Sequence, residues 1–152
     1  MELQHFEMLK RMLMCDEGVA HQIYTDTVNK QTIAVGRNLT DTKLRDNEIH
    51  LMLENDILDC YALINRDYEF FSKLSPARQC ALVDMCFMGF GKLKGFRRMW
   101  DAIRMSQYDK AAKEMLESKW ATQVHDRADR LAYIMENDKV KPEWYNEFKV
   151  IN

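Results

Sequence analysis

Apolar residues near the start of the chain recur at steps of three and four positions, the spacing of one face of a helix. They are Leu3, Phe6, Leu9 and Leu13. The pattern predicts a helix over about residues 2–14 that ends before Gly18. We expect this helix to return and pack on the helical C-terminal lobe.

The segment that follows carries the only β-strand pattern in the chain. Residues 22–27 and 31–35 are rich in Ile, Tyr, Thr and Val, the residue types that favour strands. Val28-Asn29-Lys30 between them is typical of a hairpin turn, with Asn29 able to take a positive φ. Gly36 interrupts the second strand, and residues 37–39 are compatible with a short third strand.

From Asp46 onward the apolar residues return to helical spacing. Asp46 and Glu48 place negative charge in the first turn, where the positive end of the helix dipole stabilises it. The apolar face of this helix consists of Ile49, Met52, Leu53, Ile57, Cys60, Tyr61 and Ile64. The pattern predicts a helix of about twenty residues, which is long enough to join two lobes.

Helical segments continue toward the end of the chain. Ser75-Pro76 begins one of them, with Ser as the N-cap and Pro in the first turn, and Gly89 ends it. Further helices are predicted from about residue 96, over residues 108–120 and over residues 125–137, before Pro142 ends the regular structure.

Together these elements predict an α+β fold that is mostly α. A small β-hairpin lobe of about residues 15–45 is joined by the long helix to a helical C-terminal lobe. Residues 1–14 and about 46–152 make up the helical part. The whole chain, residues 1–152, is expected to form a single domain.

Composition and charge narrow the classes of function. The 152 residues are 47% hydrophobic and 30% charged, and no apolar run approaches the roughly 18 residues that membrane insertion needs. Charged residues are interspersed among the first apolar ones, so the N-terminus is not typical of a secretory signal and we expect synthesis in a cytoplasm. The formal net charge of −2 gives no reason to expect nucleic acid as a partner.

Neither the histidines nor the cysteines have the spacing of metal ligands, so we expect no metal and no cofactor. They are His5, His21, His50, His125, Cys15, Cys60, Cys80 and Cys86. The cysteines are interpreted as buried thiols that act as small hydrophobic residues. Trp100 is interpreted as a core residue.

Three polar side chains form a candidate set for acid–base chemistry. Glu17 lies at the end of the first predicted helix, Asp26 at the hairpin and Thr32 at the start of the return strand. In glycoside hydrolysis one carboxylic acid protonates the leaving oxygen, while a second group holds a water on the far face of the sugar. Because 24 of the 152 residues are acidic, this set alone is weak, and turn and strand roles for Asp26 and Thr32 are the alternative.

The order and spacing of several motifs resemble the T4-type phage lysozymes. The N-terminal signature of that family is similar to Asp16-Glu17-Gly18, Ile23-Tyr24-Thr25-Asp26-Thr27 and Thr32-Ile33-Ala34-Val35-Gly36-Arg37-Asn38-Leu39-Thr40. The second half adds RQCALVDMCF at residues 78–87, Gly95-Phe96, and Ser118-Lys119-Trp120 with Arg127 and Arg130. The resemblance covers nearly the whole chain, and the separations between Glu17, Asp26 and Thr32 match those of the family without a gap.

The resemblance implies a role for each of four residues. Glu17 would be the general acid that protonates the glycosidic oxygen between N-acetylmuramic acid and N-acetylglucosamine. Asp26 and Thr32 would position the attacking water on the opposite face of the sugar, with inversion of configuration. Arg127 would lie against Glu17 and orient its carboxyl group.

The chain departs from the family pattern at three positions. Arg37 stands where the family usually has His, and Asp56 falls where the Asp partner of that His lies. We therefore expect an ion pair between Arg37 and Asp56. Ala34 replaces a family glycine, so the strand needs only to have room for a Cβ at this position. Met88 lies where the family commonly has an amide residue that contacts substrate.

The resemblance also suggests substrate contacts from Leu39, Phe87 and Trp120, although packing is the alternative role for Trp120. Two interpretations remain open for a group of basic residues in the second half. They are typical of a solvated face, and they would also favour docking on an anionic bacterial wall. The group consists of Lys92, Lys94, Arg97 and Arg98.

The resemblance implies an endolysin that hydrolyses the β-1,4 bond of peptidoglycan for phage-induced host lysis. It would stay in the host cytoplasm until lysis, reach the periplasm and cell wall through a holin-type membrane lesion, and act as a monomer. Two alternatives remain open: a lytic transglycosylase, which needs no water-holding Asp, and a non-catalytic lysozyme-like module that binds the wall. The presence of Glu17, Asp26 and Thr32 favours the hydrolase.

Overall fold

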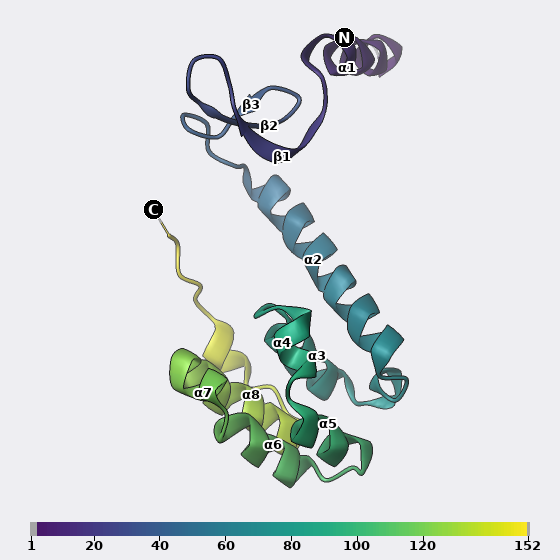
Figure 1. Cartoon of the computed structure of the whole chain (residues 1–152), viewed down its shortest axis with the longest axis vertical. Helices are drawn as coiled ribbons and strands as arrows, with labels where there is room; N and C mark the ends of the chain where they lie inside the picture. The colour runs from purple at the N-terminus through teal and green to yellow at the C-terminus, as the bar shows by residue number, and fades with distance from the viewer. Residues whose placement is uncertain (1–2, 152) are drawn as a thin grey trace. The chain divides into compact units, whose positions relative to one another are not determined.

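The computed structural model describes residues 3–151 of the chain. It is mostly helical (64%), and the described residues form one three-stranded antiparallel sheet with the strand order β1-β2-β3, which confirms the predicted α+β class. The chain divides into two compact units, Met1–Leu53 and Glu54–Asn152, and the boundary falls inside the long helix α2 (Asp46–Asp67) (Figure 1). The assignment of residues 1–14 to the helical lobe stays a prediction.

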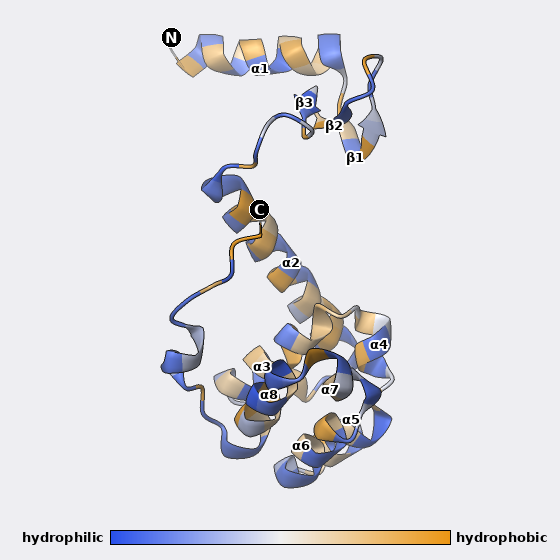
Figure 2. Cartoon of the chain, turned by 90° about the vertical axis from the view of Figure 1, so that its left-hand side faces the viewer, coloured by the Kyte–Doolittle hydropathy of each residue, from blue (hydrophilic) through white to orange (hydrophobic). Residues whose placement is uncertain are grey.

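Helix α1 (Leu3–Glu17) follows the apolar spacing of the sequence and continues beyond its predicted end. It stops at Gly18, whose φ of +78° lies in the left-handed region that residues with a Cβ rarely adopt. Hydrophobic and hydrophilic residues alternate along the ribbon of α1 (Figure 2), and none of the residues in this helix is buried. Its expected packing on the helical part stays a prediction.

The β-strand pattern forms the predicted hairpin with a short third strand. β1 (Ala20–Thr25) pairs with β2 (Gln31–Ala34), and β2 pairs with β3 (Arg37–Asn38). Asn29 has the positive φ expected at the hairpin turn, +62°. β2 is therefore the central strand, with a tight turn at each of its ends.

Ala34, the last residue of β2, is expected to be strained. Its φ is +60°, a left-handed conformation that costs a residue with a Cβ about 1–2 kcal/mol. A glycine at this position would therefore relieve backbone strain, and the preference for glycine does not depend only on the space for a Cβ. Ala34→Gly should raise the free energy of unfolding by about 0.5–1 kcal/mol, after the greater freedom of glycine in the unfolded chain is subtracted.

Urea denaturation measures this difference. Ala20→Gly is the matched control, because Ala20 lies in the same sheet without a positive φ and its replacement should be destabilising. Equal destabilisation by both substitutions would show that Ala34 is not strained.

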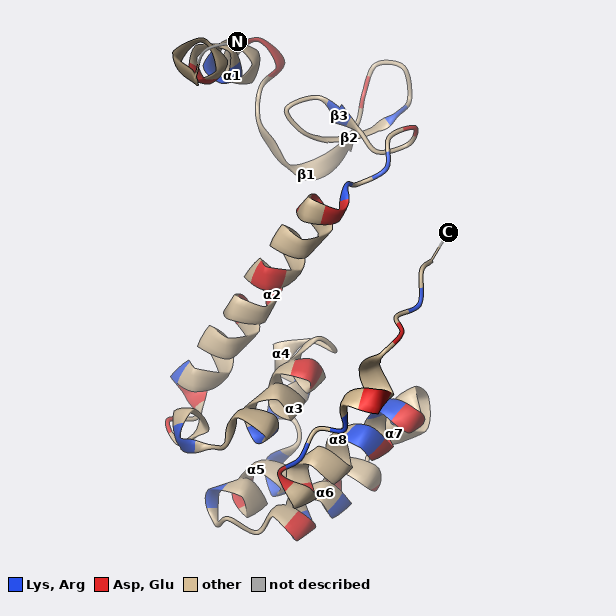
Figure 3. Ribbon diagram, turned by 180° about the vertical axis from the view of Figure 1, so that it is seen from behind, with Lys and Arg blue, Asp and Glu red and all other residues tan. Residues whose placement is uncertain are grey.

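Helix α2 is 22 residues long, close to the predicted length. Its first turn contains Asp46 and Glu48, and charged residues of both signs lie at this end of the helix (Figure 3). Glu48 accepts a hydrogen bond from the backbone N–H of Arg45 at 2.8 Å, which satisfies one of the donors that a helix start leaves without a partner. Among residues 3–151, no helix is both long enough and apolar enough to cross a membrane.

The elements described after α2 are all helical. They are η1 (Phe71–Lys73), α3 (Pro76–Cys86), α4 (Phe90–Lys94), α5 (Arg97–Arg104), α6 (Tyr108–Leu116), α7 (Lys119–Val124), α8 (Asp126–Asn137) and η2 (Pro142–Tyr145). The prediction of a single helix over residues 108–120 is wrong. Ser118 accepts a hydrogen bond from the N–H of Ala121 at 3.2 Å, so it caps a new helix and ends the old one.

The core of the helical unit contains residues of α3, α5 and α8. Leu82 of α3 and Met135 of α8 are fully buried. Trp100 of α5 is 2% exposed, donates a hydrogen bond from Nε1 to the carbonyl of Leu93 at 3.0 Å, and stacks on Tyr68 with ring centroids 3.7 Å apart. The expectation that Trp100 is a core residue is confirmed.

The cysteines divide into two groups. Cys86 is buried and Cys60 half-buried, whereas Cys15 and Cys80 are exposed, so the prediction of buried thiols is wrong for the last two. Burial and a hydrogen bond with Cys60 raise the pKa of the Cys86 thiol to about 12. Cys86 therefore stays protonated at neutral pH and acts as a core residue.

Candidate active site

Glu17 is the last residue of α1, and its carboxyl group lies beside the turn between β2 and β3. A Cβ placed on Gly36 in that turn would be 3.5 Å from Glu17 Oε2, an ordinary van der Waals distance. Gly36 has a φ of +69°, which gives the turn its direction. The Glu17 side chain is exposed and forms no hydrogen bond or ion pair with another residue in the range 3–151. Its carboxyl group is therefore available to a ligand.

Asp26 is held in the hairpin by bonds to both carboxylate oxygens. Oδ1 accepts hydrogen bonds from the backbone N–H groups of Val28 at 3.0 Å and Lys30 at 2.8 Å. Oδ2 accepts a hydrogen bond from Thr32 Oγ1 at 3.3 Å. The backbone bonds are typical of an Asp that stabilises a turn, and they direct Oδ2 toward Thr32.

Thr32 is a buried polar residue of β2, with 3% of its surface exposed. Its hydroxyl lies 3.3 Å from Asp26 Oδ2 and 3.2 Å from the carbonyl oxygen of Lys30. A hydroxyl has one proton to donate, so it can satisfy only one of these acceptors at a time and keeps lone pairs for a water. The structure thus brings Asp26 and Thr32 together as expected, and their catalytic role stays a prediction.

The central strand connects the two halves of this candidate site. β2 carries Thr32 near its start and leads into the turn at Gly36, where the Glu17 carboxyl group lies. An exposed acid and an Asp–Thr pair supported by one strand are the groups that hydrolysis of a glycosidic bond needs. Within residues 3–151, no group of three or more His, Cys, Asp and Glu side chains has an arrangement that could hold a metal ion.

The Arg37 side chain pairs with Glu48, so the predicted pair with Asp56 is wrong. Nη1 and Nη2 of Arg37 donate to Oε2 and Oε1 of Glu48 at 3.1 and 2.7 Å, a bidentate arrangement. Glu48 lies about two turns closer to the start of α2 than Asp56, and this end of the helix follows the sheet directly in the chain. The pair ties β3 to the first turn of α2.

The two donors to Glu48 make the stability of this unit depend on pH. The hydrogen bonds from the Arg37 guanidinium and the Arg45 backbone N–H lower the pKa of Glu48 from 4.5 to about 2. Because the folded-state pKa is below the unfolded one, the stabilisation is complete above about pH 4.5 and is lost as the pH falls toward 2. Glu48→Gln should therefore lower the thermal midpoint at pH 6 and change it much less at pH 2.5.

Thermal unfolding followed by circular dichroism at the two pH values tests this dependence. Glu54→Gln is the matched control, because Glu54 is an exposed carboxylate of the same helix with no ion pair to a described residue. It should leave both midpoints unchanged. A shift of equal size at pH 6 and pH 2.5 for Glu48→Gln would refute the proposed titration.

Arg127 of α8 forms an ion pair inside the helical unit. Its Nε donates to Oδ1 of Asp84 at 2.8 Å, and its Nη2 donates to the backbone carbonyl of Asp84 at 2.8 Å. These bonds tie α8 to the last turn of α3, where a cation also complements the helix dipole. Nη1 has no hydrogen-bond partner among the described residues. The predicted orientation of Glu17 by Arg127 stays a prediction.

The three suggested substrate contacts differ in exposure. Leu39 is half-buried and donates its backbone N–H to the carbonyl of Gln31 at 2.7 Å. Phe87 is exposed at the end of α3. Trp120 is 7% exposed and makes an edge contact with Phe96, ring centroids 6.0 Å apart, which favours the packing role. Substrate binding by these residues stays a prediction.

No protein-family model matches the chain. Individual proteins nevertheless align with most of its length. Two proteins of Dictyostelium discoideum, named probable T4-type lysozyme 2 and probable T4-type lysozyme 1, are 26% and 28% identical to it. The alignments cover 88% and 84% of this chain and 96% and 93% of theirs. The chain is thus similar to T4-type lysozymes over most of its length. The pre-baseplate central spike protein Gp5 of Enterobacteria phage T4 is also 28% identical over 84% of this chain, which spans 27% of the length of that protein.

This similarity agrees with a lysozyme-like α+β fold. Sequence reasoning missed the ion pairs of two carboxylates, Glu48 and Asp84. Glu48 is the third residue of α2, a position from which a Glu side chain accepts a hydrogen bond from the backbone N–H of the residue before the helix. This contact could have been predicted from the sequence. Asp84 is a half-buried carboxylate on α3, preceded by the half-buried Val83 and followed by the buried Met85. Its pairing with Arg127 depends on tertiary packing.

Proposed function

We propose that the chain is an endolysin-type muramidase that hydrolyses the β-1,4 bond between N-acetylmuramic acid and N-acetylglucosamine in peptidoglycan. The observation that carries this proposal is the hydrogen bond between Thr32 and Asp26, on the sheet whose β2–β3 turn lies beside Glu17. An acid and a water-holding pair are the two requirements of single-step glycoside hydrolysis. The relationship to T4-type lysozymes supports the choice of substrate.

In this mechanism Glu17 acts as the general acid. Its protonated carboxyl group gives a proton to the glycosidic oxygen as the bond to the anomeric carbon breaks. The exposure of the side chain supports this role, since its carboxyl group is accessible to a substrate. Glu17 takes the proton back from solvent after each turnover.

Asp26 and Thr32 hold the nucleophilic water. Oδ2 of Asp26 accepts one proton of that water, and the Thr32 hydroxyl fixes its position. Because this water attacks the face opposite the leaving oxygen, the configuration at the anomeric carbon inverts. The Asp–Thr pair also separates this mechanism from that of a lytic transglycosylase, which uses an intramolecular attack and needs no such water.

Further parts of the proposal concern the protein's setting. We place it in the host cytoplasm until lysis and then at the periplasm and cell wall, with holin-dependent access, as a monomeric bacteriolytic enzyme of a phage. The similarity to a spike protein of phage T4 supports the phage setting. The proposed orientation of the Glu17 carboxyl group by Arg127 rests on the similarity to T4-type lysozymes.

Turbidity loss of outer-membrane-permeabilised Gram-negative cells tests the proposed function, with Asp26→Asn as the variant. The Asn side chain keeps an oxygen for the two backbone N–H groups, so the hairpin is preserved while the water loses its base. We expect lysis by the wild type and a rate lower by about a hundredfold for Asp26→Asn.

The matched control is Asp59→Asn, an exposed carboxylate of α2 without an ion pair to a described residue, which should lyse cells like the wild type. Equal lysis by the wild type and Asp26→Asn would remove Asp26 from the mechanism. Absence of lysis by the folded wild type would overturn the muramidase proposal.

A further inference from the structure

Two of the cysteines lie against each other in the helical unit. Cys60 belongs to α2 and Cys86 is the last residue of α3, and their thiols share a hydrogen bond. Cys86 is 3% exposed and belongs to the core, and the half-buried Cys60 packs against that core. Both residues lie in the compact unit Glu54–Asn152, and both are free thiols. Two thiols in contact on different helices are the starting arrangement for a disulfide.

The other two cysteines do not offer Cys86 a partner in this way. Cys80 lies on the same helix as Cys86, six positions earlier, which separates the two by about 9 Å along the helix axis. A disulfide needs Cα atoms roughly 4.4–6.8 Å apart, so these two cannot be joined while α3 is intact. Cys15 lies on α1, in the other compact unit. Within the helical unit, Cys60 is therefore the cysteine that can bond to Cys86.

We propose that Cys60 and Cys86 form a redox-active pair, which closes to a disulfide under oxidising conditions and joins α2 to α3. In a cytoplasm, where thiols are kept reduced, the pair stays open. The point at which the protein meets an oxidising compartment rests on the proposed function, which places it at the periplasm after lysis. The capacity to form the bond does not depend on that function.

The oxidant is a disulfide of a small thiol or of a thiol oxidoreductase, and the exchange takes two steps. Cys60 is less buried than Cys86, so its thiolate attacks one sulfur of the oxidant, whose S–S bond breaks. The Cys86 thiol then loses its proton and attacks Cys60 Sγ, which expels the second half of the oxidant. Two protein thiols are oxidised, the external disulfide is reduced to two thiols, and the two protons end on these leaving groups.

The burial of Cys86 determines the order of these steps. Its pKa is raised to about 12 by burial and by the contact with Cys60, so its thiol is a poor nucleophile at neutral pH. Cys86 therefore reacts only when a mixed disulfide has formed on the sulfur beside it. After closure the Cys86 sulfur remains in the core, so an external reductant reaches the bond only from the Cys60 side.

The disulfide would make the stability of the helical unit depend on redox conditions. It closes a loop of roughly 25 residues that contains the end of α2, η1 and most of α3. A link over this length restricts the unfolded chain more than the folded one. We expect the thermal midpoint of the oxidised protein to lie about 5–10 °C above that of the reduced protein.

Incubation of the purified full-length protein with oxidised glutathione, followed by peptide mapping without reduction, tests the proposal. We expect a linked pair of peptides that contain Cys60 and Cys86, together with a raised thermal midpoint that dithiothreitol lowers again. The variant Cys15→Ser/Cys80→Ser removes the two exposed thiols, which would otherwise take up glutathione, and should form the same link. Cys60→Ser should show no rise on oxidation, whereas Cys80→Ser is the matched control and should respond like the wild type.

Three results would overturn the inference. They are a glutathione adduct that persists on Cys60 without a link to Cys86, an unchanged or lowered thermal midpoint of the linked protein, and an equal rise for Cys60→Ser. Cleavage of peptidoglycan by the reduced protein tests the muramidase separately, because it does not require the bond. Cleavage without a linked peptide would overturn this inference alone, and a linked peptide in a protein that does not cleave would overturn the muramidase alone.

Discussion

Replacing Glu17 with Gln is expected to lower the rate of peptidoglycan cleavage by about a thousandfold or more. The amide keeps the length and shape of the side chain but has no acidic proton, so the glycosidic oxygen must leave as an anion. Loss of a general acid costs two to four orders of magnitude in typical enzymes, roughly 3–5 kcal/mol in the activation free energy. Release of reducing ends from purified peptidoglycan measures the rate.

The fold should not change in this variant. Glu17 is exposed, and its carboxyl group forms no hydrogen bond with another described residue, so nothing in the hairpin unit depends on its charge. Asp16→Asn is the matched control, because it removes an exposed carboxylate from the neighbouring position and should retain wild-type activity. Residual activity of Glu17→Gln close to that of the wild type would exclude Glu17 as the acid.

The largest expected loss of stability follows from Trp100→Ala. Trp100 is 2% exposed, and its removal leaves a cavity between α5, Tyr68 and Phe70, with the Leu93 carbonyl deprived of its donor. Trp-to-Ala replacements in a core cost about 3–5 kcal/mol, a large part of the stability of a domain of this size. Urea denaturation of the purified variant at neutral pH measures the change.

Two further variants separate the causes of this loss. Trp100→Phe keeps one aromatic ring in the core but removes the N–H donor and part of the ring volume, so it should cost less than Trp100→Ala, about 1–2 kcal/mol. Phe148→Ala removes an aromatic ring that is 90% exposed and should change the free energy of unfolding by less than about 0.5 kcal/mol. Equal losses for Trp100→Ala and Phe148→Ala would contradict the described core.

Local sequence patterns predicted helix starts and turns well where a single residue with a strong conformational preference determines the structure. Asn29 marked the hairpin turn and Ser75 marked a helix start, and both have the expected geometry. The break at Ser118 was missed because no Gly or Pro marks it. Ser118 has an extended backbone, and its Oγ accepts the capping hydrogen bond from the N–H of Ala121. A helix cap inside a continuous apolar pattern is a weak signal in a sequence.

Contacts in the candidate site could be predicted only between residues that lie close together in the sequence. Asp26 and Thr32 are six positions apart in one hairpin, so their contact follows from the register of two strands. The partner of Arg37 was not predictable in this way. Asp56 and Glu48 share one helix, and the choice between them depends on which turn of α2 reaches β3.

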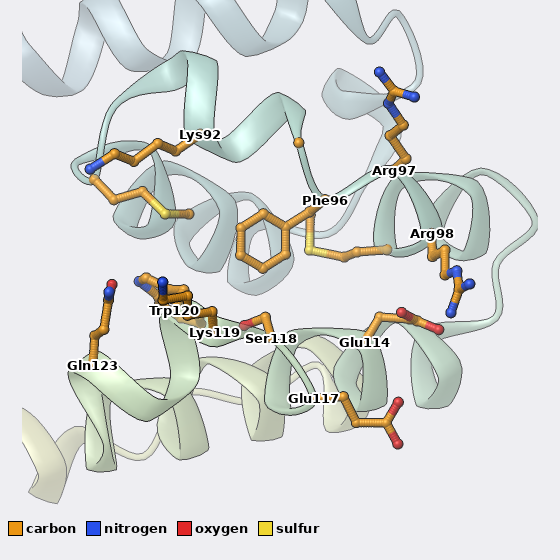
Figure 4. A pocket seen from close by; sticks show the side chains of 13 residues that line it. Lys92, Phe96, Arg97, Arg98, Glu114, Glu117, Ser118, Lys119, Trp120 and Gln123 are labelled. Carbon is orange, nitrogen blue, oxygen red and sulfur yellow. The ribbon is translucent and has the colours of Figure 1, made fainter.

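A groove in the helical unit, lined by residues of α4 to α7 (Figure 4), shows a second limit of sequence reasoning. Lys92 and Lys94 are equivalent in a charge count, but one lines the groove and the other pairs with Asp67. The distinction arises from the fold of α4 and cannot be derived from the spacing of the basic residues. A charge pattern therefore indicates that a surface is basic, and only the structure shows which cations lack a partner.

In the proposed mechanism, water held by Asp26 and Thr32 attacks the anomeric carbon while Glu17 protonates the glycosidic oxygen. Digestion of purified peptidoglycan in H₂¹⁸O, followed by mass spectrometry of the fragments, tests it most directly. We expect reducing N-acetylmuramic acid ends that carry one ¹⁸O atom from the solvent. Fragments that end in 1,6-anhydro-N-acetylmuramic acid without ¹⁸O would contradict the claim and identify an intramolecular transglycosylase.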